Sequence, residues 1–226
     1  MNATSATAEQ SENVNTVSAP VFSVYQRGYM HGNRACPQNR PSCSVTLSDV
    51  HKYITSPGAQ VATETLRQKL AKGMSKQNAG NFKLLNFPAA TFSGVFSYRK
   101  EECLVSESHL LVLDFDGITS PQDLQRLRLS LLLDDSFTTQ LLFISPSGHG
   151  LKWVIRIDDW YDLSRADFFR SLSNYICANH GFMPDPSGKD IARLCFLCHD
   201  PEAYIAPEEI RIASNINTNT SLSTLV

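Results

Sequence analysis

The alternation of apolar and polar residues is clearest in the second half of the chain. Apolar runs predict buried strands at HLLVLDFD and QLLFIS, and the alternating segment LKWVIRI predicts a third strand. Leucines at helical spacing after Pro121 and an amphipathic stretch after Ser164 predict two helices. In chain order we expect strand 109–116, helix 121–133, strands 140–145 and 151–157, helix 164–179 and strand 191–198. This βαββαβ order is that of ferredoxin-like and RNA-recognition-motif-like (RRM-like) domains.

The first half has shorter and more interrupted patterns. VFSVY is typical of a strand, Thr46 is a candidate N-cap, and a helix fits 62–72. The stretch FKLLNFPAATFSGVF contains strand-like pieces broken by Pro88. Both ends of the chain are polar, which predicts flexible tails. The expected organisation is a tail at 1–20, an N-terminal α/β module at 21–108, a second half at 109–213, the two together forming one domain over 21–213, and a tail at 214–226.

The predicted topology brings the ends of several strands together. In a βαββαβ unit the first and third strands are antiparallel neighbours, and the fourth strand lies on the other side of the first. Side chains alternate along a strand, so Asp114 and Asp116 share one face, together with Lys152 on the third strand. Leu113 and Phe115 then point to the opposite face, toward the helices.

Carboxylates two residues apart at a strand end, joined by a third from a neighbouring segment, form an all-oxygen site for Mg²⁺ or Mn²⁺. Asp114 and Asp116 supply the pair, and Asp185 and Asp190 lie at the start of the fourth predicted strand. An isolated Asp-x-Asp is more often a solvated strand end. The convergence of three segments favours the metal site.

Four segments carry a family resemblance: FPAATFSGVF, VLDFDG, SPSGHGLKWVI and DPSGKDIARLCFLCHDP. Together they resemble the primase-polymerase-like N-terminal domain of virulence-associated-E-type replication proteins of mobile elements, within the archaeo-eukaryotic primase superfamily. The similarity covers about 22–206. It implies an α+β, archaeo-eukaryotic primase-like fold, in which an N-terminal α/β module packs on a βαββαβ RRM-like (ferredoxin-like) half and holds metal and nucleotide between the two.

The resemblance implies a role for individual residues. Asp114 and Asp116 match the first motif and Asp185 matches the acid of the third motif, so these three are the expected catalytic metal ligands, with Asp190 as second choice. Arg193 falls at the position of a basic contact to the triphosphate.

The second motif departs from the family pattern, because Lys152 stands where the family has histidine. Lysine still binds phosphate as a point charge, so nucleotide binding is retained more readily than full polymerase activity. The remaining candidates for nucleotide binding are His149, Ser147, Gly148 and Lys189.

The implied function is that of a DNA primase or DNA-directed polymerase, a nucleotidyltransferase that uses two Mg²⁺ or Mn²⁺ ions. Its partners would be nucleoside triphosphates, a single-stranded DNA template and a replicative helicase. One alternative is a nucleic-acid-binding module of the same fold that has lost turnover. A second is a haloacid-dehalogenase-like phosphatase. The segment LVLDFDGI of this chain imitates the first motif of that family. That fold requires a helix after its second-motif strand, whereas here a second strand is predicted.

Composition adds a charge asymmetry to this picture. The 226 residues are 42% hydrophobic and 19% charged, which excludes collagenous, coiled-coil and wholly disordered chains. The net charge of -2 conceals two unlike halves: residues 21–100 carry eleven Lys or Arg against Asp49 and Glu64, and residues 101–226 carry nine against eighteen acids. A basic segment of this kind predicts a surface that faces the template.

The sequence has no apolar run of about 18 residues and no signal-peptide pattern, so we expect a cytoplasmic protein without a membrane partner. Its six cysteines are too sparse for a disulfide scaffold and fit reduced thiols. A structural Zn²⁺ site is a further candidate, with the ligands Cys36, Cys43, Cys195 and Cys198.

Overall fold

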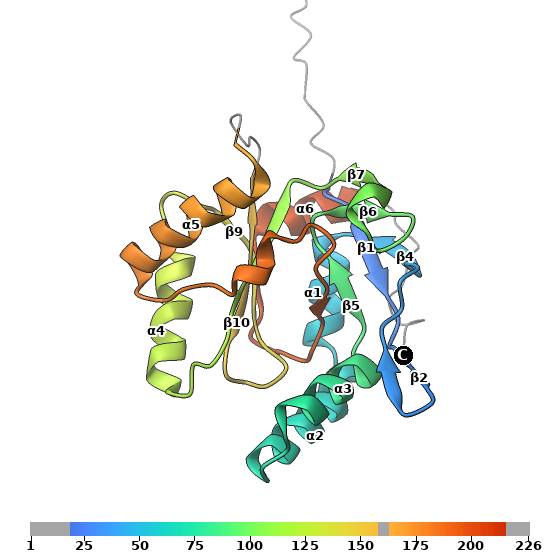
Figure 1. Ribbon diagram of the computed structural model, residues 1–226. Coiled ribbons are helices and arrows are strands. Elements are labelled where there is room, and N and C mark those ends of the chain that lie inside the picture. Colours follow the sequence, from blue (N-terminus) through green and yellow to red (C-terminus); the bar gives the residue numbers. More distant parts are fainter. Residues whose placement is uncertain (1–18, 158–162, 216–226) are drawn as a thin grey trace, which may run out of the picture.

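A computed structural model describes residues 19–157 and 163–215 (Figure 1). Apart from 19–20 and 214–215, the predicted tails lie outside the described residues. The fold is a mixed α+β arrangement with two four-stranded antiparallel sheets and two short hairpins in the described part of the chain.

The second sheet has the strand order β12-β9-β10-β8. Its helices α4 and α5 cover one face (Figure 1), and β9 runs into β10 through a turn, as the sequence predicted. The bounds are β8 (Leu110–Phe115), α4 (Pro121–Leu132), β9 (Thr139–Ile144), β10 (Leu151–Arg156), α5 (Arg165–His180) and β12 (Tyr204–Ile205).

The predicted fourth strand is wrong in extent and in place. Only β11 (Cys195–Phe196) is a strand within 191–198, and it pairs with β5 of the first sheet. The fourth strand of the second sheet is β12, which pairs with β9. As a result β8 is an edge strand, and the short 3-10 helix η3 (Pro186–Lys189) packs beside it in place of a strand.

The first sheet has the order β11-β5-β1-β4 and is built, except for β11, from the first hundred residues. Its strands are β1 (Phe22–Tyr25), β4 (Cys43–Val45), β5 (Ala89–Thr91) and β11. The remaining elements are β2 (Tyr29–His31), β3 (Arg34–Cys36), α1 (Leu47–Thr55), η1 (Pro57–Ala59), α2 (Gln60–Ala71), α3 (Lys76–Asn86), β6 (Gly94–Phe96), η2 (Glu101–Cys103), β7 (Leu104–Glu107) and α6 (Pro207–Asn215).

Local capping explains where the helices begin. Thr46 forms a capping box with Asp49, because its Oγ1 accepts from the Asp49 amide and its own amide donates to the Asp49 carboxylate at 3.0 Å. Ser75, Ser120 and Ser164 cap α3, α4 and α5 by accepting from the amide three residues later. None of the described helices is long and apolar enough to cross a membrane.

Two apolar cores lie on the two faces of the second sheet. Leu113, Phe115 and Trp153 pack against α4 and α5, and the Trp153 indole N–H donates to Thr139 Oγ1 at 2.7 Å. Leu110 and Val154 face the other way, into a core shared with α1 and the first sheet. The predicted alternation along β8 is therefore confirmed, and Asp114 and Lys152 lie on the face that looks toward the N-terminal half.

Candidate functional site

Two of the predicted acids lie at the end of β8. Asp114 is partly buried on the face of β8 away from α4 and α5, and Asp116 follows the strand and is exposed. The turn before β10 passes close to them at Gly150, where a Cβ would lie 1.9 Å from the carbonyl oxygen of Phe115. Only glycine allows this close approach, so it helps to hold the two strand ends together.

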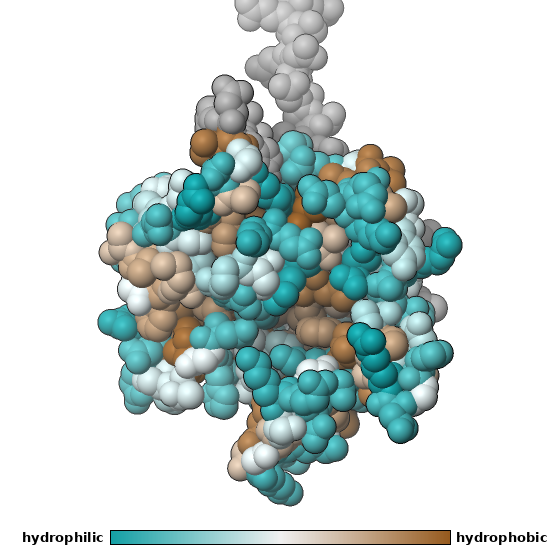
Figure 2. All heavy atoms as spheres, viewed as in Figure 1, coloured by the Kyte–Doolittle hydropathy of each residue, from teal (hydrophilic) through white to brown (hydrophobic). Residues whose placement is uncertain are grey.

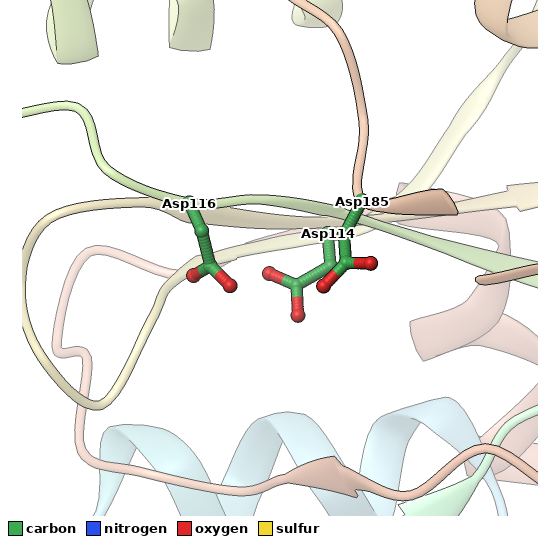
Figure 3. A group of neighbouring side chains, drawn as sticks. All are labelled: Asp114, Asp116 and Asp185. Atoms are coloured by element: carbon green, nitrogen blue, oxygen red, sulfur yellow. The ribbon is translucent and has the colours of Figure 1, made fainter. Parts of the chain in front are cut away.

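Asp185 reaches the same place from the segment that follows α5. Its amide donates to the Asp114 carbonyl oxygen at 2.7 Å, and its Oδ1 accepts from the amide and hydroxyl of Ser187 at 2.8 and 2.6 Å. These bonds form the cap of η3 and fix the carboxylate. One oxygen from each of Asp114, Asp116 and Asp185 lies within 4.8 Å of the others, and all three carboxylates point to the same side of β8 (Figure 3).

The three residues fit a divalent cation. Asp114 Oδ1 is buried and has no hydrogen-bond partner within the described ranges, which is costly unless a ligand completes it. The donor set consists of carboxylate oxygens, the hard ligands that Mg²⁺ and Mn²⁺ prefer. The acidic triad, as we name Asp114, Asp116 and Asp185, is therefore a candidate metal centre.

Lys152 lies directly opposite Asp114 on β10, and its ammonium contacts Asp114 Oδ2. Burial lowers the pKa of Lys152, but the nearby carboxylates, above all Asp114, raise it by more, so the net shift is upward and the ammonium is charged. Burial raises the pKa of Asp114, and the charge of Lys152 opposes this shift without cancelling it. The neighbouring acids Asp116 and Asp185 push the Asp114 pKa upward as well.

The pKa of Asp185 is shifted in the opposite direction, downward. Its partial burial would raise the pKa, but the hydrogen bonds from Ser187 and the positive charges of Arg193 and Lys152 lower it overall. The closest guanidinium nitrogen of Arg193 lies 3.6 Å from Asp185 Oδ2. Asp185 is thus held as a carboxylate, the form that a metal ligand requires.

A cavity of about 670 Å³ opens beside the acidic triad, between the second sheet and α3. Figure 2 shows a hollow in the middle of this face, with both hydrophilic and hydrophobic side chains around it. Five cations line the cavity against three acids, and the charged lining residues are Lys76, Lys83, Arg99, Lys152, Arg193, Asp114, Asp116 and Asp190. The cavity therefore offers positive charge close to a cluster of carboxylates.

The predicted nucleotide-binding residues divide into two groups. Lys152, Arg193 and Ser147 line the cavity. Asp190, the second choice for a metal ligand, also lines it but is not part of the acidic triad. Its Oδ1 accepts from the Ala192 amide at 2.9 Å. The other group does not line the cavity. His149 and Lys189 are exposed, and Gly148 lies against Arg67.

Sequence reasoning missed the cations contributed by the first half. Lys76 and Lys83 come from α3, which was not predicted, and Arg99 follows β6. A signal was present, because residues 65–100 contain seven Lys or Arg and no acid. It indicated a basic surface, but not that this surface faces the acidic triad.

The predicted zinc site is not formed. Cys43 on β4 and Cys195 on β11 lie at opposite edges of the first sheet, three strand spacings or about 14 Å apart. Burial raises the pKa of Cys195 and Cys198 to about 12, so both thiols are protonated in the metal-free protein. Of the His, Cys, Asp and Glu residues that the structure describes, the acidic triad is the group close enough to share an ion.

These observations define an α+β protein with a candidate carboxylate metal centre beside a cationic cavity. The family model described as BT4734-like, N-terminal domain matches residues 83–205, more than half of the chain and all of the acidic triad, and the chain belongs to this family. No curated protein matches the sequence.

One solved structure was found with weak similarity, the polymerase domain of Ligase D from Mycobacterium tuberculosis in complex with DNA. It aligns with 93% of this chain and 81% of its own chain, at 9% identity and a TM-score of 0.34. Similarity at this level does not define a shared fold.

Proposed function

We propose that this protein is a metal-dependent nucleotidyltransferase of the primase-polymerase type, which joins nucleoside triphosphates on a single-stranded DNA template. The observation that carries the proposal is the acidic triad, whose oxygens lie within 4.8 Å of one another at the edge of a cavity with five cations. Carboxylates would hold the metal and the cations would hold the triphosphate.

In nucleotidyl transfer a hydroxyl oxygen attacks the α-phosphorus of a nucleoside triphosphate, and pyrophosphate leaves. Asp114, Asp116 and Asp185 would hold Mg²⁺ or Mn²⁺, which supplies charge stabilisation for the phosphoryl group and activates the oxygen nucleophile. The chain itself binds and orients. Arg193 and Lys83 line the cavity with charges for the phosphates, and Ser147 adds a hydroxyl donor.

The size of the cavity agrees with a nucleotide substrate, because small-molecule sites are about 300 to 1,000 Å³ and this one is about 670 Å³. The motifs VLDFDG, SPSGHGLKWVI and DPSGKDIARLCFLCHDP support the finer assignment to a primase-like arrangement and to mobile-element replication, with a replicative helicase as partner. This assignment rests on the sequence resemblance.

A second candidate is nucleotide and nucleic-acid binding without turnover. The observation that favours it is the contact between the Lys152 ammonium and Asp114 Oδ2, which occupies one oxygen of a proposed metal ligand. The lysine also takes the position where the resembling family has histidine. This candidate predicts binding of nucleotide and strand with no incorporation in either Mg²⁺ or Mn²⁺.

The test is incorporation of labelled nucleotides on a single-stranded DNA template in Mn²⁺, with ribo- and deoxynucleotides offered separately. The double variant Asp114→Ala with Asp116→Ala should abolish incorporation. Asp114→Ala also leaves the buried Lys152 unpaired and is therefore expected to destabilise the fold. Asp116 is exposed, so a loss of activity in Asp116→Asn is easier to assign to the metal site.

We expect Asp116→Asn to lower the activity at least about 100-fold. Substitution of a residue that only supports a metal ligand already costs up to about 100-fold. Asp135→Asn, an exposed aspartate outside the triad, is the matched control and should keep full activity. Incorporation by the double variant at the wild-type rate would overturn the proposal.

A further inference from the structure

A short hairpin made of β2 and β3 projects beside α3 (Figure 1). Its register pairs Tyr29 with Cys36, Met30 with Ala35 and His31 with Arg34. Opposed residues in an antiparallel pair share a face, so the outer face of the hairpin holds Tyr29, Cys36, His31 and Arg34. Ala35, on the other face, is buried, and β3 packs against α3.

The outer face combines an uncovered aromatic ring with positive charge. Tyr29 is 49% exposed. Arg34 lies on the same face, Arg27 and Arg40 are exposed before and after the hairpin, and residues 13–48 contain no Asp or Glu. An exposed ring among cations, with no acid nearby in the chain, is complementary to an unpaired base and its phosphates.

Both ends of the hairpin are hydrogen-bonded to the wall of the cavity. The Gly28 amide, before β2, donates to the carbonyl oxygen of Leu84 on α3 at 2.7 Å, and Leu84 lines the cavity. After β3, Asn39 Oδ1 accepts from the guanidinium of Arg99 at 2.8 and 3.1 Å, and Arg99 also lines the cavity. The hairpin is thus a continuation of the cationic wall of the cavity.

We propose that the outer face of the β2–β3 hairpin binds one nucleic-acid strand that leads into the cavity. Tyr29 stacks on a base, and Arg34, on the same face, binds phosphate. The strand is single, because a base must be unpaired for a surface ring to stack on it. The direction toward the cavity rests on the proposed function, whereas the binding itself requires neither metal nor turnover.

The test is fluorescence anisotropy with a labelled oligothymidylate of about 20 nucleotides, longer than the site of one small binding module, in EDTA. We expect Tyr29→Ala to bind about 5- to 150-fold more weakly and Tyr29→Phe to bind as the wild type does, because phenylalanine keeps the stacking surface. Arg34→Ala should reduce the slope of log K against log salt by about 0.7, the value for one phosphate contact with a single strand.

Arg126→Ala is the matched control, because Arg126 is an exposed arginine on α4, away from the lining of the cavity. It should leave the affinity unchanged. Thermal melting of each variant checks that it is folded, which we expect because Tyr29 and Arg34 are exposed.

Equal affinity of the wild type, Tyr29→Ala and Arg34→Ala would overturn the inference, and so would a wild type that binds no strand. The proposed function would still stand or fall separately, because it is read from nucleotide incorporation and from Asp116→Asn. If Tyr29→Ala instead converted a dimer to a monomer with strand binding unchanged, the hairpin would be a self-association surface and the inference would be wrong.

Discussion

Asp134 and Asp114 are both largely buried beside the second sheet, yet their carboxylate oxygens have different surroundings. Asp134 follows α4 and its side chain is 2% exposed. Its Oδ1 accepts from the amides of Ser136 and Phe137 at 2.9 and 2.7 Å. Its Oδ2 accepts from the Tyr175 hydroxyl at 3.0 Å and from His180 Nε2 at 2.7 Å. Every lone-pair direction of this carboxylate is used by the protein itself.

Asp114 has one oxygen in contact with Lys152 and one buried oxygen without a partner among the described residues. Asp116 and Asp185 place two more carboxylates within 4.8 Å, an arrangement that opposes folding unless a cation offsets the repulsion. The difference separates two uses of the same side chain. The Asp134 network ties the ends of α4 and α5 together, whereas the acidic triad keeps a buried oxygen available to the metal ion that we propose.

The largest effect on stability is expected from Asp134→Ala. The change removes the largely buried acceptor of four donors, and it should lower the free energy of unfolding by about 3 kcal/mol. Urea denaturation measures this loss. The exposed neighbour is the control, and Asp135→Ala should change stability by less than about 0.5 kcal/mol. Equally small effects of Asp134→Ala and Asp135→Ala would contradict a stabilising role for the Asp134 network.

The acidic triad should respond in the opposite way, by gaining stability from a ligand. Mn²⁺ at about one hundred times its Kd should stabilise the wild type by about 2.7 kcal/mol in thermal unfolding. Asp116→Asn should lose about half of this gain or more, without a loss of intrinsic stability, because Asp116 is exposed. A variant that is stabilised as much as the wild type would show that the ion binds elsewhere.

The stabilisation by Mn²⁺ should also depend on pH. The pKa of Asp114 is raised above 3.8, so the folded chain holds this proton more tightly than the unfolded chain does. The ionised Asp114 therefore destabilises the metal-free protein at neutral pH, and this cost disappears as the pH falls through the raised pKa. Protons compete with the ion in that range, and the Mn²⁺-induced shift in Tm should decrease there. A shift that stays constant down to pH 3.8 would contradict the assignment of Asp114 as a ligand.

The smallest effect is expected from Tyr175→Phe. The variant keeps the edge-on ring contact with Phe137, with centroids 5.5 Å apart, and loses the hydroxyl that donates to Asp134. The loss of one of four donors should cost about 1 kcal/mol in urea denaturation and leave nucleotide incorporation unchanged. A cost as large as that of Asp134→Ala would mean that the network depends on Tyr175 alone.

The parts of this fold that sequence reasoning predicted are those governed by local patterns. Alternation along β8 places Asp114 on one face and Leu113 on the other, because the period of a strand is fixed by its backbone. Ser164 begins α5 because its hydroxyl satisfies a free amide of the first turn.

The parts that were missed depend on contacts between distant segments. β11 has two residues, and nothing within them indicates that they pair with β5 and not with β8. The helix α3 carries Gly80 in its interior and has a weak apolar stripe, so its periodicity was not recognised. The position of its lysines beside the acidic triad follows only from the packing of the two halves.

The most direct measurement of the central claim is the binding of Mn²⁺ to the metal-free protein, followed by electron paramagnetic resonance of the free ion. The wild type and Asp135→Asn should bind Mn²⁺ with the same affinity, and Asp116→Asn should bind it at least about 10-fold more weakly. Equal binding by Asp116→Asn and Asp135→Asn would contradict the account, because the acidic triad would then not be the metal centre.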